Sequence, residues 1–213
     1  MLFCIQTHVA HKGFFRKHLS LVLTVVGVFL LGFVGSEYYG MYREQKRLTQ
    51  EWEQQNVPTT DANHPRPAAD GLTRVEIPKI NLDAIVVEGA SRKQLKLGPG
   101  RITTSAHPGE VGNSVITAHR DTFFRHIYEL TKGDDILIRR NGEVFRYRVT
   151  GKKIVDPSDL SVLKQTKDAQ LTLITCYPTY FIGPAPERLV IFSKLESGPG
   201  SQETSSTVPL SVR

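Results

Sequence analysis

The sequence predicts a mainly β protein, a small closed β-barrel with short helices, preceded by one N-terminal transmembrane helix. Between residues 71 and 196, short apolar and β-branched runs alternate with turns rich in Gly, Pro and Asn, and only brief stretches fit a helix. This pattern is typical of a small barrel and unlike a parallel α/β sheet. Ahead of it, residues 19–36 carry no formal charge, as expected of a membrane span.

Length and composition limit the alternatives. The chain has 213 residues, enough for one domain of ordinary size plus appendages, and its 39% hydrophobic and 23% charged residues exclude wholesale disorder. The net charge of +6 is spread along the chain without a long basic run. A solvated basic surface explains this charge better than nucleic-acid binding does, so we expect no nucleic-acid partner.

Residues 19–36 are predicted to be an uncleaved membrane anchor. A helix of this length spans about 27 Å, near the short end for crossing a bilayer. Basic residues precede the run and tyrosines follow it: Lys12, Arg16 and Lys17, then Tyr38, Tyr39 and Tyr42. The basic flank places residues 1–18 in the cytoplasm and the chain after the anchor outside the cell membrane. A cleaved signal peptide is the alternative, because Gly35 and Ser36 supply small residues.

The region from residue 37 to residue 70 is predicted to be a stalk and linker. Residues 41–55 are charged and compatible with a helix, whereas residues 56–70 hold prolines among small and polar residues. We therefore expect the folded domain to occupy residues 71–196. Residues 197–213 are rich in Ser, Thr and Pro and predict a disordered tail.

Strands and turns follow one another through the predicted domain. The predicted strands are residues 73–77, 84–87, 114–118, 135–140, 143–149, 171–175 and 189–195. Asn-Gly at residues 141–142 is the strongest hairpin signal. Two short helices are predicted, one capped by Ser91 and one capped by Asp121 or Thr122.

Cys176 is the candidate nucleophile. It stands at the end of an apolar strand, where the strand fixes it and the following turn leaves it reachable. The only other cysteine, Cys4, is predicted to be cytoplasmic, so the two do not pair. A small buried hydrophobe is the alternative for Cys176. A lone thiol in an exported domain is a liability unless it is buried or used, which favours a reactive thiol.

His119 and Arg188 are the predicted partners of this thiol. His119 follows the strand at residues 114–118, and Arg188 opens the last strand. A histidine is the usual activator of a thiol nucleophile, and an arginine supplies hydrogen bonds to a developing oxyanion. Asp121 either orients the imidazole or caps a helix. Zinc is a weaker alternative, with His107, His119, His126 and Cys176 as possible ligands in a spacing that fits no familiar zinc motif.

Residues 172–176 read Thr-Leu-Ile-Thr-Cys and match the T-L-x-T-C signature of the sortases. Residues 118–122 resemble the histidine segment of that family, and Arg188 lies where its arginine precedes the last strand. The resemblance covers the exported domain and looks most like the class D branch. It implies a sortase-like barrel of about eight strands. It also implies Cys176, His119 and Arg188 as catalytic residues and Thr175 as a residue that shapes the substrate site.

The resemblance further implies a cysteine transpeptidase. Its thiol attacks a Leu-Pro-x-Thr-Gly-like sorting signal after Thr, and an amine from a cell-wall precursor or a pilin lysine resolves the thioacyl-enzyme. Surface proteins with a C-terminal sorting signal would be its partners. Some relatives bind calcium, but Asp134 and Asp135 fit a charge pair at a strand start better, so we expect no cofactor and no metal.

Two other functions stay open on the sequence. An extracytoplasmic thiol peptidase would let water resolve the acyl-enzyme, and a non-catalytic envelope adhesion module would leave a sorting peptide uncut. The L,D-transpeptidases, another Cys/His family of the envelope, keep the histidine close before the cysteine. Here His119 lies far upstream of Cys176, which excludes that family.

Overall fold

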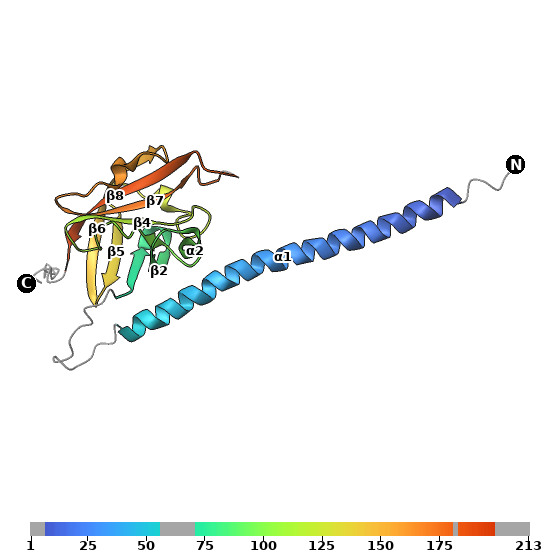
Figure 1. Cartoon of the computed structure of the whole chain (residues 1–213), viewed down its shortest axis with the longest axis horizontal. Coiled ribbons are helices and arrows are strands. Elements are labelled where there is room, and N and C mark those ends of the chain that lie inside the picture. Colours follow the sequence, from blue (N-terminus) through green and yellow to red (C-terminus); the bar gives the residue numbers. More distant parts are fainter. Residues whose placement is uncertain (1–6, 56–70, 181–182, 199–213) are drawn as a thin grey trace, which may run out of the picture. The chain divides into compact units, whose positions relative to one another are not determined.

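The computed structural model describes residues 7–55, 71–180 and 183–198 (Figure 1). The chain divides into two compact units, Met1–Arg43 and Glu44–Arg213. The predicted linker at residues 56–70 and most of the predicted tail lie outside the described residues.

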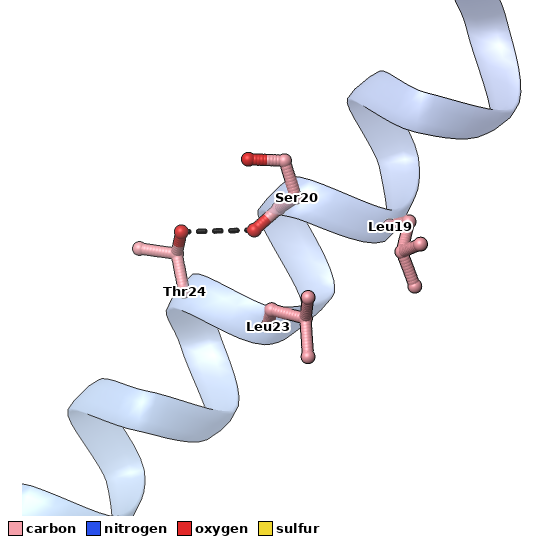
Figure 2. A pocket seen from close by; sticks show the side chains of 4 residues that line it. All are labelled: Leu19, Ser20, Leu23 and Thr24. Carbon is pink, nitrogen blue, oxygen red and sulfur yellow. Dashed lines mark hydrogen bonds between the residues drawn. The ribbon is translucent and has the colours of Figure 1, made fainter.

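Helix α1 (Thr7–Gln55) forms the first unit, and its last turns belong to the second. Within the described chain it is the one helix long and apolar enough to cross a membrane, by length and composition. Its apolar side chains between residues 19 and 34 are exposed. Figure 2 shows one stretch, where the hydroxyl of Thr24 donates to the carbonyl of Ser20 at 2.8 Å, so this polar group is satisfied within the helix. The predicted long apolar N-terminal helix is confirmed.

Within the described part of the second unit, eight strands close into a barrel in the order β1-β2-β3-β4-β7-β8-β6-β5. The strands are β1 (Thr73–Ile77), β2 (Leu82–Glu88), β3 (Gly100–Arg101), β4 (Gly112–Thr117), β5 (Asp135–Arg140), β6 (Glu143–Val155), β7 (Ala169–Tyr177) and β8 (Glu187–Ser197). The helices between them are η1 (Pro78–Ile80), α2 (Arg92–Leu95), η2 (Ile127–Glu129) and η3 (Leu160–Leu163). The pairs β2–β3 and β4–β7 are parallel, and the other pairs are antiparallel. The predicted mainly β barrel is therefore confirmed.

The core fills the barrel interior. Because side chains alternate along a strand, each strand contributes every second residue, such as Ile136 and Ile138 of β5, both fully buried. The segment after β4 adds Phe124 and Ile127 to the same cluster. Each fully buried side chain of this kind stabilises the fold by about 1.5–3 kcal/mol. This packing holds the ends of the strands, where the candidate site lies.

Local sequence signals predict two connections correctly. Asn141 and Gly142, between β5 and β6, have φ values of 54° and 76°, the positive values that a type I′ hairpin turn requires. Ser91 caps α2 through a capping box, in which its side chain accepts from the amide of Gln94 and the side chain of Gln94 accepts from the amide of Ser91.

Other elements differ from the prediction. The helix predicted after Asp121 is wrong, because the segment folds into turns in which the amides of Thr122 and Phe124 both bond to the carbonyl of His119. Only η2 follows, and it has no side-chain cap. β6 continues to Val155, beyond its predicted end, because a register shift lets the strand pass Gly151 and keep its pairing with β8.

Candidate active site

Three strand ends meet at one edge of the barrel. β4 and β7 are parallel neighbours, with Thr117 paired to Ile174, so both strands end at the same edge. His119 follows β4, and Cys176 lies near the end of β7. β8 runs antiparallel to β7 and begins there, with Arg188 paired to Cys176. The topology thus brings together the three residues that the sequence predicts as catalytic.

Cys176 and Arg188 belong to the outer face of the barrel. Their strand neighbours Thr175 and Leu189 are buried in the interior, and Ala118, directly before His119, is buried as well. Successive side chains point to opposite faces of a sheet. Cys176, His119 and Arg188 are accordingly only half-buried, and Cys176 is a free thiol. The site is therefore open to a molecule that lies against the outside of the barrel.

Thr175 bonds the end of β7 to the end of β4. Its hydroxyl donates to the carbonyl of Ala118 at 2.8 Å, and the amide of Ala118 donates to the carbonyl of Ile174 at 3.2 Å. The hydroxyl of Thr117 donates to the same Ile174 carbonyl at 3.0 Å. These bonds fix the residues directly before the histidine and the cysteine. Thr175 is itself buried, so its contact with a substrate stays a prediction.

Arg188 is held beside the cysteine strand by its own connection. Its Nη1 donates to the carbonyls of Glu187 at 2.9 Å and Ala185 at 3.3 Å. Hydrogen bonds from Ser158 lower the pKa of Asp156 after β6, and the positive charge of Arg188 adds a smaller effect in the same direction. The guanidinium therefore places positive charge at this edge of the barrel.

A second apolar cluster, which we call the outer cluster, adjoins the site. Its buried members are Val155, Val162 and Val190, and its half-buried members are Leu163, Ile174 and Phe192. Ile174 lies two residues before the cysteine on β7, and Val190 lies two residues after the arginine on β8, on the same faces of their strands. The thiol of Cys176 and the guanidinium of Arg188 thus lie at the end of a partly buried apolar cluster. Such a combination suits a peptide with both apolar and reactive parts.

His126 and His107, the two other histidines considered as zinc ligands, make contacts of their own. The Nδ1 of His126 lies 2.8 Å from Oε1 of Glu129, and the amide of His107 donates to the carboxylate of Glu110 in the loop before β4. Among the described residues, no three His, Cys, Asp or Glu side chains are placed to hold a metal ion together. Asp121 is exposed in the turn after the candidate histidine, and its orienting role stays a prediction.

Sequence reasoning overlooked Arg120. Its guanidinium donates to the carbonyl of Pro178 at 3.1 Å and to the carbonyl of Gly183 at 2.7 Å, both in the connection between β7 and β8. The sequence signal was only its place directly after the candidate histidine. Its acceptors are backbone carbonyls distant in the chain, which no motif records.

Known proteins resemble this chain. The family model described as "Sortase domain" matches residues 75–196. Sortase D of Bacillus subtilis (strain 168) is 40% identical over 121 residues, a match that covers 56% of this chain and 61% of that protein. Sortase A of Listeria monocytogenes is 26% identical over 189 residues, covering 76% of this chain and 84% of that protein. The structure of a Clostridium perfringens Sortase D5 transpeptidase superposes with a TM-score of 0.62 at 25% identity, covering 73% of this chain and 99% of that one.

Proposed function

Because the chain belongs to the sortase family, we propose that it is a membrane-anchored cysteine transpeptidase of the cell envelope with Cys176 as nucleophile. One observation supports this above all. The parallel pairing of β4 with β7 and the antiparallel pairing of β7 with β8 bring the strand ends next to His119, Cys176 and Arg188 to one edge of the barrel. A thiol beside a base and a cationic donor is the combination that acyl transfer through a thioester requires.

The first half of the reaction forms the acyl-enzyme. The thiolate of Cys176 attacks the threonine carbonyl of a Leu-Pro-x-Thr-Gly-like signal, and a tetrahedral oxyanion develops. Arg188 donates hydrogen bonds to that oxyanion or to the signal backbone. The bond after threonine breaks, His119 gives its proton to the leaving amine, and the threonine carbonyl stays on sulfur as a thioester.

The second half transfers the peptide. An amine attacks the thioester carbonyl and loses a proton to His119, the carbon–sulfur bond breaks, and the thiolate is restored. The acceptor is an amine of a cell-wall precursor or a pilin lysine, and the donor is a surface protein with a C-terminal sorting signal. Apolar residues of that signal are expected to lie near the outer cluster, since it adjoins the cysteine.

Localisation is the third part of the proposal. The long apolar helix anchors the chain by a single pass. Lys12, Arg16 and Lys17 precede the apolar run, so the N-terminus stays in the cytoplasm and the barrel lies outside the cell membrane. In that position the site reaches exported substrates and the cell wall.

Intact-mass analysis tests the reaction class. The full chain, in detergent micelles, is incubated with a panel of Leu-Pro-x-Thr-x peptides. We expect a mass gain equal to the peptide portion through threonine, absent in Cys176→Ala. Addition of an amine acceptor should then give ligated peptide. Hydrolysed peptide alone would identify a thiol peptidase instead, and uncut peptides across the panel would identify a non-catalytic module.

A further inference from the structure

The connection between β7 and β8 joins the candidate nucleophile to the candidate oxyanion donor. Its described parts are residues 178–180 and 183–186. Cys176 lies two residues before the connection, and Arg188 lies two residues after it. The ladder between the two strands extends to the pair Tyr177 and Glu187. Beyond that pair, the position of the connection depends on contacts with other parts of the barrel.

Arg120 makes one such contact. One guanidinium nitrogen donates to the carbonyl of Pro178, at the start of the connection, at 3.1 Å. Another donates to the carbonyl of Gly183, in its second half, at 2.7 Å. A planar guanidinium is suited to this task because its fork holds two acceptors in a fixed geometry. A single side chain thus joins both halves of the connection to the segment that carries His119.

A second contact supports the first. The hydroxyl oxygens of Tyr128 and Tyr180 are 2.8 Å apart, and their rings meet edge to face with centroids 6.0 Å apart. The bond to Tyr180 raises the pKa of Tyr128 to about 12. Nζ of Lys152, on β6, donates to the carbonyl of Tyr128 at 2.6 Å, which fixes Tyr128 to the barrel wall. We call Arg120, Tyr128 and Tyr180, with the two carbonyls, the loop tether.

We propose that Arg120 is a positioning residue that sets the place of Arg188 and Cys176 relative to His119 through the loop tether. This inference rests on the proposed transpeptidase function. The path is short, because Arg120 holds Gly183, and the carbonyl of Ala185, two residues later, accepts from Arg188. A shift of the connection therefore moves an acceptor of the Arg188 guanidinium. Misplacement by about 1 Å costs a catalysed reaction about 100-fold in rate.

The test compares Arg120→Ala and Arg120→Lys in the full chain in nanodiscs. Arg148→Ala is the matched control, because Arg148 also bonds a carbonyl, that of Gly133, and pairs with Glu196, but takes no part in the tether. Two quantities are measured, amide hydrogen exchange in peptides covering residues 178–187 and the kinetics of peptide cleavage. Thermal unfolding confirms that each variant is folded.

For Arg120→Ala we expect exchange in residues 178–187 to rise at least about tenfold and kcat to fall about 10- to 100-fold. KM should change less than about threefold, because the outer cluster is untouched. For Arg120→Lys, the exchange rate and kcat should lie between those of the parent chain and Arg120→Ala, because an ammonium lacks the planar fork of a guanidinium. Arg148→Ala should match the parent chain. If Arg120→Ala fails to fold, Arg120→Lys decides by the same readouts.

Two outcomes overturn the proposal: unchanged exchange in a folded Arg120 variant, or faster exchange with unchanged kcat. If the parent chain forms no thioester with any peptide, the proposed function fails, and the alkylation rate of Cys176 by iodoacetamide replaces kcat. A changed alkylation rate in Arg120→Ala, with faster exchange, then still supports the positioning role, and an unchanged rate overturns it.

Discussion

At the scale of single residues, the buried hydroxyl of Thr175 connects the two strand ends next to the candidate site. Its bond to the carbonyl of Ala118 joins the strand of the cysteine to the strand of the histidine one residue before each. The sequence predicts Thr175 as a residue that shapes the substrate site. The structure places it in the barrel interior, and its role toward the substrate stays a prediction.

We predict that Thr175→Val destabilises the fold and slows acyl-enzyme formation. Valine fills the same volume but leaves the Ala118 carbonyl without this donor, at a cost of about 1–3 kcal/mol in the free energy of unfolding. The relative position of thiol and imidazole loosens as well, so acylation should slow by about tenfold or more. Urea unfolding and intact-mass kinetics measure the two effects. Thr175→Ser keeps the hydroxyl and should keep the stability and the acylation rate of the parent chain. A Thr175→Val variant with unchanged stability and unchanged acylation rate would refute the prediction.

Tyr147 gives a prediction for alkaline pH. Burial raises its pKa above the ordinary 10.0, against the opposing effect of the bond that the amide of Gly109 donates to its hydroxyl at 2.7 Å. Above about pH 10, the unfolded chain loses this proton while the folded chain retains it, so the free energy of unfolding falls as pH rises through that range. Below pH 10 the contribution is complete.

Urea unfolding at pH 9 and pH 10.5 checks this. The parent chain should lose more stability over that interval than Tyr147→Phe, which has no proton to release. Tyr42→Phe, which removes an exposed hydroxyl from α1, is the matched control and should behave as the parent chain. An equal loss in the parent chain and in Tyr147→Phe contradicts the prediction.

The sequence predicts Cys176, His119 and Arg188 as site residues because each stands next to an apolar strand, the first two within a motif and Arg188 before the last strand. Arg120 is not predicted. Its acceptors are backbone carbonyls 58 and 63 residues away in the chain. Every residue type has such a carbonyl, so the sequence does not mark an acceptor. Side chains that bond to the backbone across a fold leave no pattern at the acceptor end.

At the scale of elements, the end of α1 is part of the second unit. The Oε1 of Gln45 accepts from the amide of Ile85 at 2.9 Å, and its Nε2 donates to the carbonyls of Ile85 and Leu97 at 3.1 and 2.8 Å. Its amide thus completes the hydrogen bonding of β2 as a neighbouring strand would. Leu48, one turn later, is buried, and the guanidinium of Arg74 lies over the ring of Trp52 at 5.0 Å. The predicted start of the domain near residue 71 stays a prediction, but these turns of helix contact the barrel before it.

We predict that Gln45→Ala lowers the free energy of unfolding of the full chain by about 2 kcal/mol or more, because it leaves the Ile85 backbone without its partner. Arg47→Ala, two residues along the same helix, is the control. Arg47 is exposed and pairs with Glu44 and Glu51 of its own helix, so its loss should leave the free energy of unfolding close to that of the parent chain. Chemical denaturation followed by tryptophan fluorescence measures both. Equal effects of the two substitutions would show that the helix end adds nothing to the barrel.

Elements with strong local signals are also those that the sequence predicts well. The Asn-Gly turn at residues 141–142 and the capping box at Ser91 depend on residues a few positions apart. β3 has only Gly100 and Arg101, which hold no periodicity, and it exists because β2 and β4 pair on either side of it. The turns after β4 replace the predicted helix because packing of Phe124 in the core prevails over helix propensity.

At the scale of the whole molecule, the sequence predicts the barrel but not its strand order. The parallel neighbours β4 and β7 are separated by two strands along the chain, and their pairing depends on contacts that no local pattern encodes. Strand-end placement and motif resemblance together predict the site residues, and the registers of β4, β7 and β8 bring the three strand ends to one edge.

The two cysteines allow the orientation of the whole molecule to be tested. Lys12, Arg16 and Lys17 precede the apolar run, so Cys4 should face the cytoplasm and Cys176 the outside. In intact cells, a membrane-impermeant maleimide should therefore label the Cys4→Ser variant at Cys176 and leave the Cys176→Ala variant unlabelled until the membrane is permeabilised. Labelling of Cys4 in intact cells would reverse the orientation and place the thiol of Cys176 on the side without exported substrates. The mass of the mature chain completes the argument, because a chain that retains residues 1–36 is anchored by this helix, whereas a cleaved signal peptide would remove Cys4 altogether.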